Sequence, residues 1–154
     1  MRCGNRQYVA VVEKVIAASP ERVFAVLADG WTYSDWVVGT AHIRDVDADW
    51  PAPGAQIYHQ AAGWPLRLKD KTVVLASDPP HELVMRPHLW PLGELTVKFT
   101  LTPLNERETK VTLAEDVAAG PLRWVRTKAE DLLMHYRNRE TLNRLSDLAV
   151  RRHP

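Results

Sequence analysis

The residues best suited to chemistry are two carboxylates, Asp70 and Glu115, which their neighbours place on apolar faces of β-strands. Successive side chains of a strand point to opposite faces, so residues two positions apart share a face. In a strand predicted over 65–77, three alternating basic residues form an outward row, which leaves Asp70 and Thr72 facing inward. In a strand predicted over 109–117, Glu115 shares its face with apolar side chains.

A buried carboxyl group has a raised pKa and can act as a general acid or base, so Asp70 and Glu115 are the candidate catalytic residues. Each has a structural alternative. A bulge or the end of the strand would turn Asp70 to water. Glu115 would instead form a salt bridge with an arginine or lysine at the rim of a cavity.

The sequence carries none of the common motifs for metal, nucleotide or nucleophilic chemistry. Its six histidines are scattered over predicted elements and form no HExxH motif or helical H-x-x-x-H pair. There is also no G-x-S-x-G turn, Walker loop or GxGxxG fingerprint. We therefore expect no metal and no nucleotide cofactor.

Composition favours one cytoplasmic domain. The chain has 154 residues, 45% of them hydrophobic, and a single cysteine, Cys3, which excludes a disulfide framework. A formal charge of +1 with interspersed signs argues against nucleic-acid binding, and no apolar run is long enough to insert in a membrane. We expect a flexible N-terminus over 1–6, a domain over 7–151 and a tail over 152–154.

Local patterns predict a strand, two short helices, six strands and a long helix. The strand over 7–17 is rich in β-branched residues and is expected to be buried on both faces. Ser19 and Pro20 are typical of a helix start, and a second short helix is expected over 31–36. Period-two segments then predict strands over 40–46, 55–62, 65–77, 81–88, 93–103 and 109–117, before a helix from Gly120-Pro121 to Arg151.

The long helix carries two apolar stripes on nearly opposite sides. The first contains Leu122, Val125, Ala129, Leu132, Leu133 and Tyr136, and the second contains Trp124, Thr127, Met134, Asn138, Leu142, Leu145 and Ala149. Either the helix kinks near Tyr136, or its first half buries one side and exposes the other to a cavity or a partner. We expect the second stripe to face the sheet, because it extends to the end of the chain.

This order of elements, the segment from Ser19 to Leu27, the pair Trp31 and Trp36, and the closing segment Arg137-Asn138-Arg139-Glu140-Thr141-Leu142 resemble the START-like superfamily. The superfamily is also called Bet v 1-like or SRPBCC, and the similarity is to its polyketide cyclase/dehydrase branch, over roughly 8–149. It implies an α+β helix-grip fold, with a curved seven-stranded antiparallel sheet wrapped around a long C-terminal helix. Two short helices would lie between the first and second strands, held to the sheet edge by both tryptophans.

The resemblance implies a carrier or sensor that binds an apolar small molecule, such as a lipid, polyketide or polycyclic compound, in an internal cavity. Such cavities usually hold about 300–1,000 Å³. One alternative is a polyketide cyclase or aromatase that uses acid/base residues of the pocket, and another is an interaction protein or homodimer through the outer face of the long helix. A monomer and a homodimer are both open.

The expected ligand-binding residues are those that face inward on the predicted strands and the long helix. For the strands over 55–62 and 81–88 the inner face is ambiguous, because Ile57 and His59 compete with Tyr58, and Leu83 and Met85 compete with Val84 and Arg86. The predicted set is His59, Leu68, Thr72, Met85, Val97, Phe99, Leu113, Met134 and Asn138.

Overall fold

The computed structural model describes residues 10–61, 68–89, 93–120 and 128–151. The predicted N-terminus and tail therefore lie outside the described residues, as do Leu122, Trp124, Val125 and Thr127 of the helix stripes. Leu68 belongs to a described strand, but its side chain lies outside the described part. Within the described ranges, no helix combines the length and apolar character needed to cross a bilayer.

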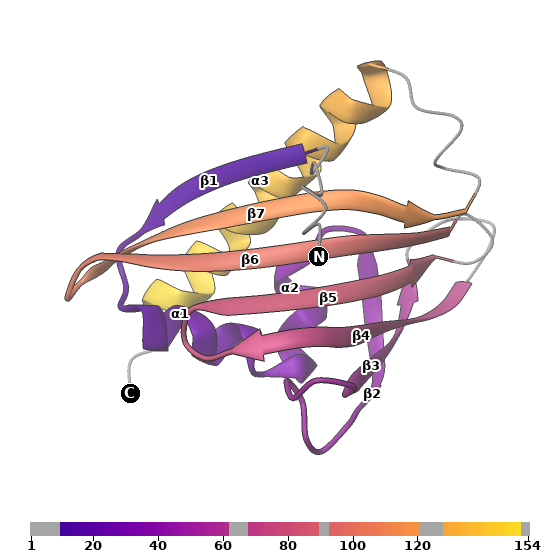
Figure 1. Cartoon of the computed structure of the whole chain (residues 1–154), viewed down its shortest axis with the longest axis horizontal. Helices are drawn as coiled ribbons and strands as arrows, with labels where there is room; N and C mark the ends of the chain where they lie inside the picture. The colour runs from indigo at the N-terminus through magenta and orange to yellow at the C-terminus, as the bar shows by residue number, and fades with distance from the viewer. Residues whose placement is uncertain (1–9, 62–67, 90–92, 121–127, 152–154) are drawn as a thin grey trace, which may run out of the picture.

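The fold is the predicted α+β helix grip, with a curved antiparallel sheet around one long helix (Figure 1). The elements are β1 (Ala10–Ile16), α1 (Pro20–Leu27), the 3₁₀ turn η1 (Gly30–Thr32), α2 (Tyr33–Trp36), β2 (Thr40–Val46), β3 (Gln56–Ala61), β4 (Leu68–Asp78), β5 (Glu82–Leu89), β6 (Gly93–Asn105), β7 (Glu108–Ala119) and α3 (Lys128–Arg151). The strand order is β1-β7-β6-β5-β4-β3-β2, and every neighbouring pair is antiparallel.

Helix α1 begins where the sequence predicts. The Ser19 side chain accepts a hydrogen bond from the Arg22 amide at 3.4 Å, and Pro20 occupies the first turn. The apolar side of α1 is buried in the core, including Val23 and Leu27. The Arg22 guanidinium also donates to the carbonyls of Ala149 and Val150, so α1 is joined to the C-terminal end of α3.

The expectation that the first strand is buried on both faces is wrong. Val12 and Ile16 are buried, but Val11 and Val15 are about half exposed, at 50% and 51%. The reason is that α3 covers β1 on one face, so the side chains of the other face point to solvent. The β-branched residues thus reflect strand propensity rather than burial on two sides.

The two ambiguous strands have definite inner faces. Ile57 and His59 are the buried residues of β3, and Leu83 and Met85 are buried in β5. In β6 the predicted alternation is confirmed, with Leu95, Val97, Phe99 and Leu101 all in the core.

The second stripe of the long helix faces the interior, as predicted. Asn138, Leu142, Leu145 and Ala149 are buried, whereas Leu132, Leu133 and Tyr136 are 72%, 67% and 70% exposed. Helix α3 runs without interruption from Lys128 to Arg151, so the described residues of the two stripes lie on two sides of one helix.

Only one of the two tryptophans expected to be structural is buried. Trp36 is 1% exposed and packs edge-to-face against Tyr33 and Phe99, with ring centroids 5.2 and 5.7 Å apart. Trp31 is 59% exposed, so its predicted packing role is wrong. In η1 it is Gly30 that is packed inward, where a Cβ atom would come within 2.7 Å of the Val46 side chain, and Trp31 is left at the surface.

The two tryptophans form a matched pair for a stability test. We expect Trp36→Ala to lower the free energy of unfolding by about 3–5 kcal/mol, because it removes a buried aromatic ring and leaves a cavity. Trp31→Ala should change it by no more than about 0.5 kcal/mol. Urea denaturation of both variants measures this, and equal losses would contradict the packing described here.

Candidate functional site

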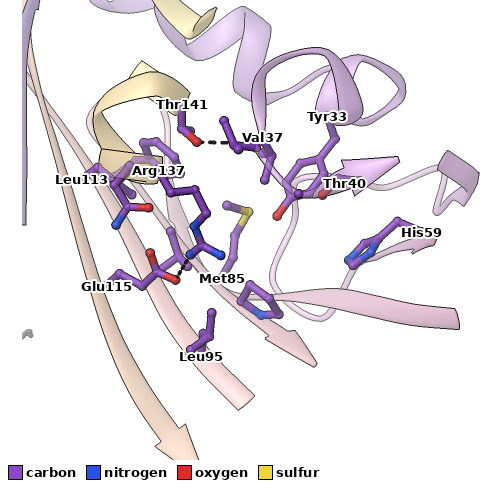
Figure 2. A pocket seen from close by; sticks show the side chains of 16 residues that line it. Tyr33, Val37, Thr40, His59, Met85, Leu95, Leu113, Glu115, Arg137 and Thr141 are labelled. Atoms are coloured by element: carbon purple, nitrogen blue, oxygen red, sulfur yellow. Dashed lines mark hydrogen bonds and ion pairs between the residues drawn. The ribbon is translucent and has the colours of Figure 1, made fainter. Parts of the chain in front are cut away.

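A cavity of about 90 Å³ lies between the concave face of the sheet, α3 and the connection from α2 to β2 (Figure 2). The described residues that line it are Tyr33, Val37, Val38, Gly39, Thr40, His59, Met85, Pro87, Leu95, Val97, Phe99, Leu113, Glu115, Arg137, Asn138 and Thr141. Gly39 is exposed and Arg137 is partly exposed, so the lining includes residues that reach the surface of the protein.

The cavity is smaller than the expected range of about 300–1,000 Å³. Large polar side chains take up much of the space between the sheet and the helix. Tyr33 and His59 extend from one side, and Arg137 reaches in from the other (Figure 2). The number and alternation of apolar residues in the sequence indicate a cavity. They do not indicate how much of it large polar side chains fill.

One wall of the cavity is apolar and comes from three adjacent strands. Met85 lies on β5, Val97 and Phe99 on β6, and Leu113 on β7, and all four are at most 9% exposed. All four line the cavity, and their contact with a ligand stays a prediction.

The remaining predicted ligand contacts fall in different places. His59 and Asn138 line the cavity and are each 3% exposed. Thr72 is fully buried and contacts His59 but is not among the described lining residues. Met134 is half-buried and is likewise absent from the described lining.

Glu115 forms an ion pair with Arg137 across the cavity. The Arg137 Nη2 atom donates to Glu115 Oε1 at 2.5 Å; the Glu115 side chain is 2% exposed and that of Arg137 is 35% exposed (Figure 2). Glu115 therefore forms the salt bridge with an arginine that was the structural alternative to a catalytic role. The sequence reasoning did not select Arg137 as a site residue. The sequence feature that could have identified Arg137 is its position directly before Asn138, beside the stripe of the long helix that faces the interior.

A second polar group connects α2 to the sheet. A hydrogen bond of 2.9 Å joins His59 Nε2 to Thr72 Oγ1, and the Tyr33 ring stacks on the His59 ring with centroids 5.9 Å apart. Tyr33 also hydrogen-bonds with Thr72. Tyr33 was missed as well, although its position three residues before Trp36 on a helix predicts the same face.

Burial keeps both rings of this group neutral near pH 7. Burial raises the pKa of the Tyr33 hydroxyl from 10.0 to about 12, and the charge of Glu115 acts in the same direction, against the Thr72 hydrogen bond and the charge of Arg137. Burial lowers the pKa of His59 from 6.5 to about 4, with a further contribution from the positive charge of Arg44. Tyr33 is therefore a hydrogen-bonding phenol and His59 an uncharged imidazole.

Asp70 faces inward, as strand parity predicts, and is 5% exposed. It pairs with His59 in the β3–β4 register, so both side chains lie on the same face of the sheet. The alternative that a bulge or strand end turns it to water is wrong. Asp70 is not among the described lining residues, so the two predicted carboxylates do not meet at the cavity. In the described part of the chain, no three His, Cys, Asp or Glu side chains are grouped to hold a metal ion.

A curved sheet closed by one long helix around an open-ended cavity defines a protein of the helix-grip class. The chain belongs to the family described as polyketide cyclase / dehydrase and lipid transport, whose model matches residues 8–149. This range coincides with the extent of the resemblance seen in the sequence.

Solved structures share the fold at low sequence identity. The Zhui aromatase/cyclase from Streptomyces sp. R1128 is similar with a TM-score of 0.70 and 18% identity, over 93% of each chain. Protein MLL2253 from Mesorhizobium loti gives a TM-score of 0.69 and 20% identity, over 94% of this chain and 98% of that one. DynU16, from the dynemicin biosynthetic locus, gives 0.63 and 16%, over 90% of this chain and 45% of its own. No curated protein matched the sequence.

The neutral state of buried His59 predicts a pH dependence of stability. Between about pH 6.5 and pH 4 the unfolded chain binds a proton that folded His59 does not, so the free energy of unfolding falls as the pH falls. The loss over this window amounts to about 3 kcal/mol. We expect His59→Gln to have a shallower pH dependence than the parent, measured by urea denaturation from pH 7 to pH 4.5.

His42→Gln is the control, because His42 is exposed on β2. It should keep the slope of the parent. If His59→Gln also keeps that slope, His59 is not the buried neutral group described here.

Proposed function

We propose that this protein binds an apolar small molecule in the cavity, as a carrier or sensor. The observation that supports it most is the apolar wall of β5–β7, whose side chains line the cavity. A mostly apolar pocket with a few converging polar groups is typical of small-molecule sites. The family description, which includes lipid transport, agrees with this function.

The size of the cavity bears on how the ligand is held. A volume of about 90 Å³ suits a small part of a ligand rather than a whole lipid. A larger lipid, polyketide or polycyclic compound would bind with one part inside. The rest would extend out of the cavity, which is not fully enclosed.

Filling the cavity tests this function. We expect Val97→Phe to weaken binding of the neutral fluorescent probe N-phenyl-1-naphthylamine at least about tenfold, because the added ring occupies the space of the ligand. Val84→Phe makes the same change at a partly exposed position of β5 and should bind the probe like the parent. Equal affinities for all three proteins would overturn the proposed function.

A cyclase or aromatase is the second candidate, without metal or nucleotide cofactor. It is favoured by the buried Glu115 carboxylate and the neutral Tyr33 hydroxyl, which both line the cavity. Cyclisation needs little more than shape, exclusion of water and one or two proton-transfer groups. One of the similar folds is that of an aromatase/cyclase.

The two candidates differ in what Glu115→Gln should do. If Glu115 transfers a proton, the variant should lose about 10²–10⁴-fold in turnover of a poly-β-ketone substrate and still bind the neutral probe. Asp70→Asn is the comparison, since Asp70 is buried but is not among the described lining residues. If the parent shows no turnover, or if both variants change it only in step with their thermal stability, the carrier function remains.

We also propose a cytoplasmic location and a monomeric or homodimeric state. The exposed side chains of Leu132, Leu133 and Tyr136 form the surface at which a second copy would pack. Sedimentation of the protein with and without Leu133→Lys distinguishes the two states.

A further inference from the structure

Two buried polar atoms at the cavity lack a hydrogen-bond partner among the residues that the structure describes. One is Nδ2 of Asn138, on α3, and the other is Nδ1 of His59, on β3. Both residues line the cavity, and each is 97% buried. His59 Nδ1 can donate or accept depending on the tautomer, but Asn138 Nδ2 can only donate. Asn138 therefore carries the inference.

An unpaired donor next to an apolar wall selects what can fill the space between them. A hydrocarbon would leave Nδ2 without a partner, which costs binding free energy. A ligand oxygen within reach of Nδ2 removes that cost. Buried polar groups of this kind discriminate more strongly between ligands than an apolar wall does.

The cavity is also electrically balanced. Of its described lining residues, only Glu115 and Arg137 carry a charge near pH 7, and they pair with each other. Tyr33 and His59 are neutral there. A ligand carboxylate would therefore meet no free cation among the described lining residues, and burial of an unpaired charge is strongly unfavourable.

We propose that the ligand is a neutral oxygenated compound whose carbonyl or hydroxyl oxygen accepts a hydrogen bond from Asn138 Nδ2, while its apolar part lies against the wall of β5–β7. This inference rests on the proposed function and narrows it. It sets ketones, phenols and alcohols apart from plain hydrocarbons and from fatty-acid anions. Arg137 then keeps its bond to Glu115 when the ligand is bound.

Three single-ring probes of similar size separate these chemistries. Acetophenone offers a neutral acceptor, ethylbenzene offers none, and benzoate carries a negative charge. Titrations followed by ¹⁵N–¹H NMR should give acetophenone about tenfold tighter binding than ethylbenzene, with benzoate weakest. The side-chain amide signals of Asn138 should move with acetophenone and remain nearly unchanged with ethylbenzene.

Asn138→Leu has a side chain of similar size without the donor. It should abolish the preference for acetophenone, so that the two neutral probes bind with similar affinity, and ethylbenzene should bind at least as tightly as it does to the parent. Asn143→Leu is the matched control, because Asn143 is exposed on the same helix and should leave all affinities as they are. If Asn138→Leu does not fold, the Asn138 amide signals of the parent protein still decide the outcome.

The outcomes separate this inference from the proposed function. If ethylbenzene binds as tightly as acetophenone, or benzoate binds most tightly, the inference is overturned and an apolar pocket remains. If N-phenyl-1-naphthylamine and all three small probes fail to bind, the proposed function is overturned together with it.

Discussion

The ion pair between Glu115 and Arg137 is the interaction on which the cavity depends. A carboxylate that is almost fully buried on the concave face of a sheet needs a cation, and α3 supplies it. The pair fixes α3 over β7 at one turn of the helix. The next inward positions, Asn138 and Thr141, then face the cavity. Thr141 in turn accepts a hydrogen bond from the Val38 amide, so the connection after α2 is held to the same turn.

This arrangement explains how polar and apolar parts share one small space. Apart from Glu115, the described lining residues of β5, β6 and β7 have apolar side chains. The polar side chains come from the opposite sides, and His59 and Tyr33 hydrogen-bond through the Thr72 hydroxyl. Among the described lining residues, the ion pair and the neutral rings leave no net charge. The site thus favours compounds with a large apolar part and few uncharged oxygens.

Much of the fold could be predicted because it depends on local patterns. The alternation of Leu95, Val97 and Phe99 defines the inner face of β6, and the same parity places Asp70 and Glu115 inward. The features that were missed depend on contacts between distant segments. Parity shows that Glu115 needs a partner, but only the packing of α3 on β7 selects Arg137, 22 residues later. The exposure of Val11 follows from the cover of β1 by α3 on one face, which the composition of the strand does not report.

The central claim is that this cavity holds a neutral, oxygen-containing small molecule. Native mass spectrometry of the protein purified from its own host tests it most directly, with the released compound identified after denaturation. The account predicts added mass that is lost on denaturation, from a compound without ionisable groups that contains a carbonyl or hydroxyl oxygen. A released fatty-acid anion or plain hydrocarbon would contradict the account. So would a protein that carries no small molecule from its host and binds none of the neutral probes.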